Sequence, residues 1–439
     1  MKKYGCIGKK LTHSFSKEIH GKLAGYQYDL IELTEEEIAP FFAQKEFAAI
    51  NVTIPYKQTV IPYLDVVSPI AQRIGAVNTV VNKEGTLYGY NTDYYGMKAL
   101  IEKVGIDLTG KKVLVLGTGG TSKTARVVAT DLGAAQILTV SRRKSEQHIT
   151  YEEAAKDHSD ADVIINTTPA GMYPDCGSKP IDIAPFEKLS GLIDVVYNPL
   201  RTNLVMDALE RGIRAEGGLY MLVMQAVVAV ERFLDTTIEK NVADQVFASI
   251  LAAKENIVLT GMPGSGKSTV GKLLDLPGFE FVDTDAEIEK RCGFPIKTLI
   301  GEKGEGYFRD LESAVIRDVS SCGCRVISTG GGAILREENV RSLKQNGNAG
   351  VGVGAGIDDD TIHDTISLLD LIYQSAFVVG LETSHFHALL VAMVFNFFQQ
   401  IGIGLPAVVC RLPDAQHIEI RSVDNKDLHK MSSSRFVVI

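Results

Sequence analysis

The sequence predicts an α/β fold with parallel sheets. Three apolar runs have the length and β-branched content of buried strands, and they are residues 111–117, 161–166 and 192–197. Patterns of helical period separate these runs, as in residues 125–132. A glycine-rich turn follows an apolar run twice, at residues 117–123 and again at residues 261–269. Because strands that alternate with helices form parallel sheets whose end loops bind ligands, we expect two α/β units, each with its own ligand site.

The composition favours a globular chain that acts on small molecules. The 439 residues are 45% hydrophobic, enough for about three domain cores, and the net charge is −9. An acidic chain offers no basic face to nucleic acid, and no segment is long and apolar enough to span a membrane. The six cysteines lack the spacing of a disulfide framework or a zinc site. We therefore expect a cytoplasmic protein whose partners are small molecules, with no nucleic acid and no membrane.

The first glycine loop has the layout of a dinucleotide site. The strand at 111–117 runs into GTGGTSK and then into a helix, as in a dinucleotide-binding βαβ unit. Ser122 stands where the fingerprint has its third glycine, so a tight strand-to-helix turn is the alternative. The next strand, at 137–140, ends in a cluster with three cations: Ser141, Arg142, Arg143 and Lys144. Cations in place of the usual acidic residue suit a 2′-phosphate, and hence NADP, whereas the alternative is a set of solvated surface charges.

Four polar segments precede this loop, and they are THSFS at 12–16, NVTIPYK at 51–57, GAVNT at 75–79 and NTD at 91–93. Each has an ordinary structural explanation, because Ser16 or Asn91 can cap a helix and Lys57 can be a solvated turn residue. Together they place hydroxyls, amides, one ammonium and one carboxylate beside a nicotinamide site. That set suits a small polyhydroxylated acid, with Lys57 and Asp93 as proton-handling partners.

A resemblance to a known family ties these segments together. With SRR at 141–143, YNP at 197–199 and GLYMLVMQ at 218–225, they resemble shikimate dehydrogenase over residues 1 to about 252. The resemblance implies that Lys57 and Asp93 are the catalytic pair. The shikimate site would be lined by Ser14, Ser16, Thr53, Asn78, Tyr197 and Gln225. The NADP contacts would come from Gly117, Thr118, Gly119, Gly120, Thr121, Ser141, Arg142, Arg143, Lys144, Val195 and Gly218.

The same resemblance implies a division of the chain and a reaction. A substrate domain at 1–98 would be completed by helices at 219–252, with a Rossmann-type NADP domain at 99–218 between them. The implied reaction transfers hydride from NADPH to the 3-keto carbon of 3-dehydroshikimate, in the biosynthesis of chorismate and the aromatic amino acids. Lys57 would give positive charge and a proton to the nascent alkoxide, and Asp93 would hold the ammonium in place. No metal is needed for this step, and a homodimer is left open.

The second glycine loop, GMPGSGKST at 261–269, matches a phosphate-binding P-loop. It follows an apolar run at 256–260 and precedes a helical pattern at 269–274. Backbone N–H groups of such a loop surround a phosphate chain, Lys267 would reach the terminal phosphates, and the Ser268 hydroxyl would bind Mg²⁺. The alternative is a flexible turn that matches by chance. We therefore expect ATP and Mg²⁺, held by Gly264, Ser265, Gly266, Lys267, Ser268 and Thr269.

Three later motifs extend this interpretation, and they are VDTD at 282–285, FRDLE at 308–312 and STGGG at 328–332. Singly, an aspartate can cap a helix, and Arg309 with Glu312 can be an ordinary surface pair. In this order the motifs resemble shikimate kinase over residues 256 to about 347. The residues implied for Mg²⁺ are Ser268 and Asp283, and those implied for shikimate are Asp285, Arg309 and Gly331.

The second resemblance stops before residues 348–439. The kinase family continues with an Arg-Pro segment, an Arg-bearing lid and a further substrate arginine, and 348–439 show none of these motifs. We expect this tail to be an unassigned, disordered or non-native segment, with out-of-frame translation as one explanation, and the kinase-like module at 256–347 to be impaired. The alternatives are a fully bifunctional enzyme and a non-catalytic ligand-sensing regulator, and the presence of both Lys57 and Asp93 argues against the regulator.

Overall fold

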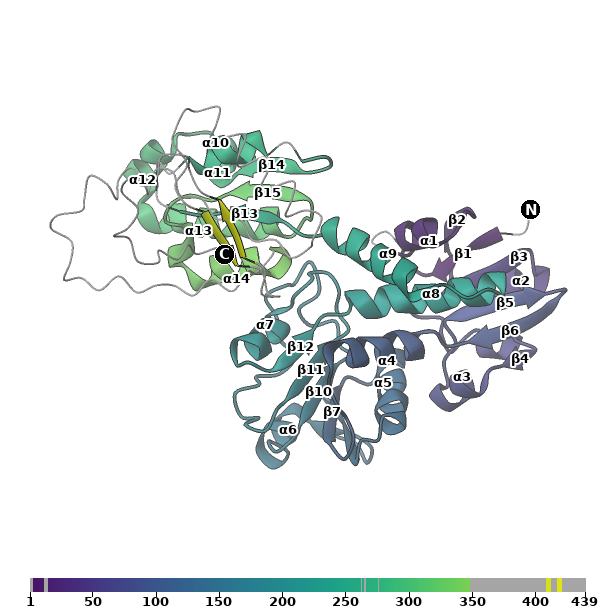
Figure 1. Ribbon diagram of the computed structural model, residues 1–439. Coiled ribbons are helices and arrows are strands. Elements are labelled where there is room, and N and C mark those ends of the chain that lie inside the picture. Colours follow the sequence, from purple (N-terminus) through teal and green to yellow (C-terminus); the bar gives the residue numbers. More distant parts are fainter. Residues whose placement is uncertain are drawn as a thin grey trace. The chain divides into compact units, whose positions relative to one another are not determined.

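The computed structural model describes residues 3–11, 15–261, 263, 266–274 and 276–347, and two short strands near the C-terminus. The chain forms two compact units, Met1–Lys254 and Glu255–Ile439 (Figure 1). The two C-terminal strands, β16 (Val408–Arg411) and β17 (His417–Ile420), pair antiparallel with each other. The expectation for the rest of 348–439 lies outside the described residues.

The first unit begins with a mixed six-stranded sheet in the order β2-β1-β3-β5-β6-β4. Its strands are β1 (Lys3–Gly8), β2 (Tyr28–Glu32), β3 (Phe47–Val52), β4 (Val66–Val67), β5 (Thr79–Lys83) and β6 (Thr86–Tyr90). Strands β2, β1 and β3 are parallel, whereas β5 pairs antiparallel with β3 and β6. Glu84 and Gly85 take positive φ angles of 53° and 90°, as a two-residue hairpin requires. The antiparallel pairs of β5 with β3 and with β6 make the sheet mixed instead of wholly parallel.

Helices cover both faces of this sheet. Because successive strand residues point to opposite faces, each strand contributes side chains to the cores on both sides. In β1, Ile7 packs with Phe42 and Ile50 on one face, and Cys6 packs near Phe233 on the other. The helices are α1 (Ser16–Leu23), α2 (Glu35–Gln44), η1 (Ile61–Tyr63), α3 (Pro69–Ile74), α8 (Leu219–Leu234) and α9 (Lys240–Ala252). The long apolar helix α8 contacts α1, β3 and β5, so residues late in the unit complete the core of its first sheet.

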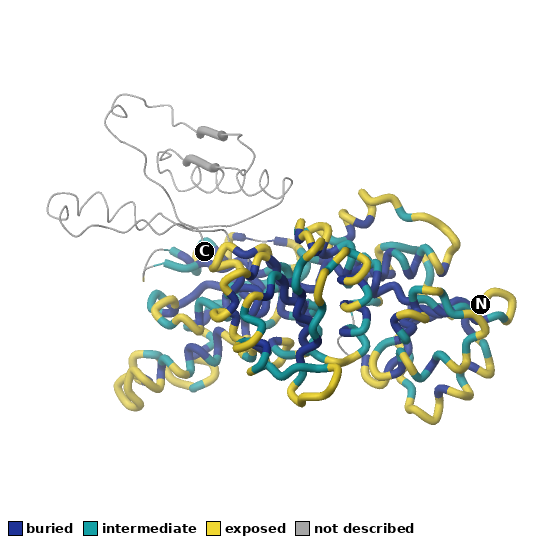
Figure 2. Tube along the Cα trace, turned by 90° about the horizontal axis from the view of Figure 1, so that it is seen from below, coloured by how far each residue is buried: buried dark blue, intermediate teal, exposed yellow. Residues whose placement is uncertain are grey.

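The second sheet of this unit is entirely parallel, in the order β12-β11-β10-β7-β8-β9. Its strands are β7 (Lys112–Leu116), β8 (Gln136–Ser141), β9 (Ile149–Thr150), β10 (Val163–Asn166), β11 (Gly191–Asp194) and β12 (Arg214–Glu216). Its helices are α4 (Asp93–Val104), α5 (Gly120–Asp131), α6 (Tyr151–Asp157) and α7 (Asn203–Glu210). Val113 and Leu114 enter different cores on the two faces, which explains why the central strands read as continuous apolar runs. Figure 2 shows that the outer turns are largely exposed, whereas the interior segments of the described chain are largely buried.

Besides β16 and β17, the described part of the second unit contains a smaller parallel sheet in the order β13-β15-β14. Its strands are β13 (Ile257–Leu259), β14 (Glu280–Asp283) and β15 (Arg325–Ser328). Its helices are α10 (Lys267–Leu273), α11 (Thr284–Cys292), α12 (Ile296–Lys303), α13 (Glu305–Ser320), η2 (Ala333–Leu335) and α14 (Glu337–Asn346). Ile288, Val315 and Ile327 lie in one core between these helices and the sheet. The predicted strand–loop–helix context of the second glycine loop is therefore present.

Candidate active site

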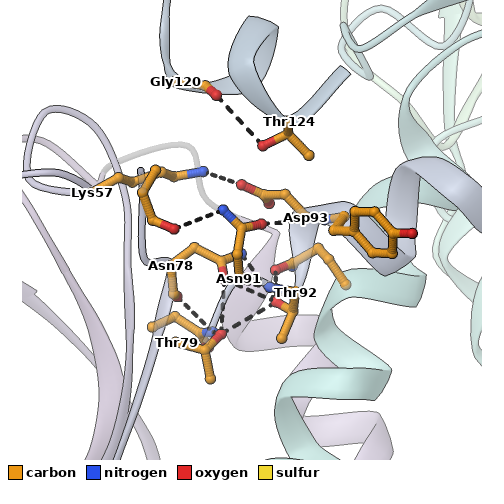
Figure 3. Close-up of polar contacts among 12 residues, drawn as sticks. Lys57, Asn78, Thr79, Asn91, Thr92, Asp93, Gly120 and Thr124 are labelled. Carbon is orange, nitrogen blue, oxygen red and sulfur yellow. Dashed lines mark hydrogen bonds and ion pairs between the residues drawn. The ribbon is translucent and has the colours of Figure 1, made fainter. Parts of the chain in front are cut away.

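Lys57 and Asp93 form an ion pair in the first unit. Lys57 lies in the loop after β3, and Asp93 is the first residue of α4. The distance from Lys57 Nζ to Asp93 Oδ2 is 2.5 Å, and the two side chains are 17% and 11% exposed. Figure 3 shows the ammonium pointing at the carboxylate. A largely buried pair that still reaches solvent can hold a proton where a bound substrate could receive it.

The loop that carries Lys57 is anchored on both sides. The buried residue before it, Tyr56, donates its hydroxyl to the carbonyl of Leu33 at 2.6 Å. The carbonyl of Lys57 itself accepts the N–H of Val77 at 2.7 Å. Because the backbone is held at both points, the position of the ammonium depends mainly on the side chain and on its partner Asp93.

A buried network of amides and hydroxyls holds the segment before Asp93 (Figure 3). The Thr92 N–H donates to Asn78 Oδ1 at 2.7 Å, and Asn78 Nδ2 donates back to Thr92 Oγ1 at 3.0 Å. Asn91 Oδ1 caps the first turn of α4 by accepting a backbone N–H at 3.2 Å. Gln225, from α8, lies with Oε1 3.4 Å from Thr92 Oγ1. Hydrogen bonds to Thr92 thus join the predicted residues Asn78 and Gln225 to the segment that carries Asp93. Asp93 in turn pairs with the predicted residue Lys57.

Sequence reasoning missed several members of this network, among them Asn51 and Thr79. Asn51 Nδ2 donates to Thr79 Oγ1 at 3.1 Å, and Thr79 Oγ1 donates to Asn78 Oδ1 at 3.1 Å. The hydroxyl of Tyr28 donates to Asn51 Oδ1 at 2.7 Å. All of these groups are buried, so each polar atom needs a partner within the protein. A polar residue inside an apolar strand was the available signal, because Asn51 interrupts the run at 47–52.

The other residues predicted for shikimate lie on neighbouring elements. Ser16 begins α1, and Thr53 follows β3 directly, with its N–H donating to Ile7 O at 3.0 Å. Tyr197 lies in the loop after β11, and its ring packs on that of Phe15 with centroids 5.2 Å apart. Burial raises the pKa of Tyr197. Within the described residues neither Thr53 nor Tyr197 gives a side-chain hydrogen bond to the network. Ser14 lies outside the described residues.

The first glycine loop joins β7 to α5 as predicted. Gly117 has a φ of 102°, and a Cβ there would lie 3.0 Å from Thr167 Oγ1 and from Thr168 Cγ2. Around Gly119 and Gly120, by contrast, an added Cβ would meet nothing within 4 Å. The loop residues at the start of α5 are Gly117, Thr118, Gly119, Gly120 and Thr121. Open space at a helix N-terminus, where backbone N–H groups lack intrahelical partners, suits the pyrophosphate of a dinucleotide.

The cation cluster after β8 divides into two parts. Lys144 forms an ion pair with Glu153, which raises the pKa of Lys144. Arg142 and Arg143 are exposed, and among the described residues neither guanidinium has an ion-pair partner. Ser141 Oγ accepts the N–H of Arg143 at 3.3 Å. Of the three predicted cations, the two arginines are therefore the ones available to a 2′-phosphate.

The remaining two residues of the predicted NADP set pack directly on each other. A Cβ on Gly218 would lie 2.2 Å from the carbonyl oxygen of Val195, so only glycine allows this approach. The N–H of Gly218 donates to the carbonyl of Val196 at 2.8 Å. The loop after β11 and the start of α8 are thus joined at this point.

The second unit places the predicted metal ligands in contact. Ser268 Oγ donates a short hydrogen bond to Asp283 Oδ2, and Lys267 Nζ donates to Gly261 O at 2.9 Å. Burial lowers the pKa of Lys267. Gly266, at a φ of 83°, precedes α10, which also contains the predicted residue Thr269, while Gly264 and Ser265 lie outside the described residues. Hard oxygen donors of this kind suit Mg²⁺. Asp283 also caps α11, so the helix-capping role and the predicted role as a Mg²⁺ ligand are compatible.

The predicted shikimate residues of the second unit converge on the triple glycine. An added Cβ on Gly330 would lie 2.6 Å from Asp285 Oδ1, and one on Gly332 would lie 2.6 Å from an Arg309 nitrogen. Gly331 lies between these two glycines, against Pro263. Burial raises the pKa of Asp285, with the charges of Asp283 and Glu312 as further causes.

Glu312 is the residue of this second site that sequence reasoning missed. Arg309 donates to Glu312 Oε2 at 2.9 Å, and Glu312 is only 1% exposed, so the pair is not the surface pair considered above. The other carboxylate oxygen of Glu312 is buried and has no hydrogen-bond partner among the described residues. The carboxylate therefore has an unused acceptor beside the glycine turn.

Comparisons with known proteins agree with this geometry. A family model described as the shikimate dehydrogenase substrate binding domain matches residues 6–80. The NADP(+)-dependent shikimate dehydrogenase of Clostridium perfringens strain SM101 is 35% identical over 268 residues, which cover 57% of this chain and 98% of the relative. The chain belongs to the shikimate dehydrogenase family. A family model described as shikimate kinase matches residues 263–349.

Solved structures of shikimate dehydrogenases match the first unit. Shikimate dehydrogenase 1 from Peptoclostridium difficile is 36% identical, with a TM-score of 0.53, over 57% of this chain and 98% of that one. A chorismate mutase/shikimate 5-dehydrogenase fusion from Clostridium acetobutylicum is 34% identical, with a TM-score of 0.54, over 57% and 97%. The Thermus thermophilus enzyme, solved with NADP(H) and shikimate, is 26% identical, with a TM-score of 0.50, over 57% and 99%.

These matches confirm the predicted shikimate dehydrogenase fold and the kinase-like second module at the level of family. They cover nearly the whole of each dehydrogenase relative but only 57% of this chain. The roles of single residues in either unit stay predictions. No helix in the described part of the chain is long and apolar enough to cross a membrane.

Proposed function

We propose that the first unit reduces 3-dehydroshikimate to shikimate with NADPH. The observation that carries the proposal is the Lys57–Asp93 pair, 2.5 Å apart and largely buried. NADPH would supply the hydride to the 3-keto carbon. Lys57 donates a proton to the oxygen that becomes the hydroxyl, so the negative charge never persists on the alkoxide. Asp93 orients the ammonium for this transfer.

The substrate is held by the amide and hydroxyl groups around this pair. Asn78 and Gln225 are the strongest candidates, because the hydrogen bonds through Thr92 connect both to the Asp93 segment. Ser14, Ser16, Thr53 and Tyr197 complete the proposed set for the ring hydroxyls and the carboxylate. The family membership and the shikimate complex of the Thermus thermophilus relative support shikimate as the ligand.

The coenzyme is NADP in this proposal. Gly117 to Thr121 would receive the pyrophosphate, with Val195 and Gly218 beside it, and Arg142 and Arg143 would bind the 2′-phosphate. The exposed, unpaired state of both guanidiniums among the described residues supports the 2′-phosphate role. In this proposal the protein acts on small molecules in the cytoplasm. The molecular mass measured in solution would decide whether it forms a homodimer.

The test is the reduction of 3-dehydroshikimate, followed by loss of NADPH absorbance, in the full chain. Lys57→Ala should lower kcat by roughly 100-fold or more, the usual range for a lost positioned acid. Lys83→Ala is the matched control, because Lys83 pairs with Asp235 at 3.6 Å on the surface, where the side chains are 48% and 89% exposed. A Lys57→Ala enzyme with unchanged kcat and a raised KM would make Lys57 a binding residue only.

We propose that the second unit binds ATP, Mg²⁺ and shikimate but transfers phosphate slowly or not at all. Lys267, Ser268 and Asp283 support nucleotide and metal binding, and Asp285 and Arg309 support shikimate binding. Cations that close over the transferring group can contribute roughly 10³ or more in rate, and the sequence after 347 shows no family lid motif. The alternative is a fully bifunctional enzyme.

The kinase proposal is tested by ADP release from ATP, Mg²⁺ and shikimate, with Lys267→Ala as the control. Slow or undetectable turnover agrees with the proposal. Robust turnover that requires shikimate and disappears in Lys267→Ala would establish the fully bifunctional enzyme instead.

A further inference from the structure

One buried carboxylate lies at the edge of the parallel sheet where the proposed coenzyme loops begin. Asp194 is the last residue of β11 and is fully buried. It accepts three hydrogen bonds, from Asn166 Nδ2 at 2.9 Å, the Val196 N–H at 3.0 Å and Thr202 Oγ1 at 2.7 Å. No lysine, arginine or histidine in the described residues forms an ion pair with it. A buried carboxylate held by neutral donors alone is costly to fold, and so needs a reason to be there.

The three donors come from two segments at this edge. One of them, Asn166, ends β10, and its Oδ1 accepts both the N–H and the hydroxyl of Thr168, at 3.0 and 2.7 Å. Thr168 in turn borders Gly117 of the glycine loop, because a Cβ on Gly117 would lie 3.0 Å from Thr168 Cγ2. The position of the glycine loop is therefore limited by a residue that Asp194 fixes through Asn166.

The other two donors fix the segment after β11. The Val196 N–H is bound by Asp194, while the Val196 carbonyl accepts the N–H of Gly218 at 2.8 Å. Thr202 donates its hydroxyl to Asp194 and accepts the N–H of Val205 at 3.3 Å, so it also caps α7. The segment between Val196 and Thr202 is thus attached to the same carboxylate at both ends.

We propose that Asp194 is a positioning residue of the coenzyme cleft, whose carboxylate sets the glycine loop, the β10 loop and the β11 loop relative to one another. The proposal rests on the proposed use of NADP by this unit. Asp194 itself need not touch the coenzyme. It acts through Asn166 and Thr168 on Gly117, and through Val196 on Val195 and Gly218.

Protonation of this carboxyl should leave the arrangement in place. Burial raises the pKa of Asp194 to about 6, although the three donors oppose the rise. A protonated carboxyl keeps Oδ1 as the acceptor for Asn166 and Val196, and its own proton can be donated to Thr202 Oγ1. An Asp194→Asn variant has the same pattern of acceptor and donor, so it imitates the protonated form.

The test compares three variants of the full chain by direct NADP⁺ titration and by steady-state kinetics. Asp194→Ala leaves three donors unpaired and should raise Kd for NADP⁺ and KM for NADPH about tenfold, with KM for 3-dehydroshikimate changed less than about threefold. Asp194→Asn should restore both constants to within about threefold, because Oδ1 keeps two acceptor contacts and the new NH₂ can donate to Thr202 Oγ1. Asp162→Ala is the matched control, since that carboxylate binds the Lys112 N–H at 2.8 Å at the opposite end of the same sheet.

The results separate the positioning role from a purely structural one. Equal shifts in Asp194→Ala and Asp162→Ala, or an unchanged Kd in Asp194→Ala, would overturn the proposal. If Asp194→Ala does not fold, Thr202→Val removes one donor to Asp194, together with the acceptor of the Val205 N–H, with little change of shape. It should raise Kd for NADP⁺ about threefold, and an unchanged Kd there overturns the proposal as well. A wild type that fails to bind NADP⁺ at all would refute the proposed function and the positioning role together.

Discussion

Replacement of Gly117 by alanine is a sharp test of how the first glycine loop is built. Its φ of 102° is a conformation that residues with a Cβ rarely adopt. The new methyl group would also lie 3.0 Å from Thr167 Oγ1 and Thr168 Cγ2, closer than ordinary van der Waals contact. The loop must therefore either accept strain or change shape at the point where the pyrophosphate is expected.

The two effects give the magnitude. Backbone strain at such a position costs about 1–3 kcal/mol, and crowding in a packed site costs about 1–3 kcal/mol more. A total of roughly 2–6 kcal/mol corresponds to a fall in Tm of roughly 5–20 °C for a unit of this size. If the loop relieves the strain by moving, the cost appears instead as weaker NADP⁺ binding, by roughly tenfold for each 1.4 kcal/mol.

The assay is thermal unfolding of the full chain with and without NADP⁺, in which the transition that NADP⁺ shifts reports the first unit. Gly21→Ala in α1 is the control, because an added Cβ there meets nothing within 4 Å and the backbone is helical. That control should stabilise the unit by about 0.5–1 kcal/mol. A Gly117→Ala protein with the wild-type Tm and the wild-type Kd for NADP⁺ would refute the reasoning.

Two further predictions concern charged groups of the first unit. Replacing Arg142 and Arg143 together by glutamine should raise KM for NADPH by tenfold or more while changing KM for NADH by less than about threefold. The control is Lys156→Gln, an exposed change on α6, which should affect neither KM. Equal effects on both coenzymes would refute the 2′-phosphate role. Asp131 accepts two hydrogen bonds from Arg73, at 3.1 and 2.6 Å, which lower the pKa of Asp131. Because Arg73 is 50% exposed, Asp131→Asn should cost only about 1 kcal/mol in urea unfolding at pH 7. In the wild type this contribution is present above pH ~4 and is lost as the pH falls through the lowered pKa, so a variant as stable as the wild type at pH 7 would show that the contact contributes nothing.

The strands of the second sheet could be predicted closely, and the errors have local causes. The predicted strand at 111–117 became Lys112–Leu116, but the one predicted at 192–197 ends at Asp194. The reason is that the Asp194 carboxylate accepts the N–H of Val196 and turns the chain, and apolar residues continue past that point. A backbone N–H that donates to a side chain two residues earlier leaves no trace in the hydrophobic pattern.

The candidate site could be predicted as far as its motifs reached. Lys57 and Asp93 belong to distinctive motifs, and the structure brings their side chains together, but their catalytic role stays a prediction. Asn51 and Thr79 were missed because they act from inside strands, where their partners depend on the register of β3 and β5. Lys144 was assigned with its neighbours, but the pairing with Glu153 depends on how α6 approaches β8, which the motif does not contain.

The return of α8 to the first sheet has a consequence for synthesis on the ribosome. The strands of that sheet end at Tyr90, but the helix that supplies Ala229 and Phe233 to its core is translated only after the whole parallel sheet. At about 5–20 residues per second, one apolar face of the nascent sheet stays uncovered for roughly 7–30 seconds. A chaperone that binds apolar surface would therefore bind the incomplete nascent chain. A premature stop before residue 219 would release a product that cannot bury this face.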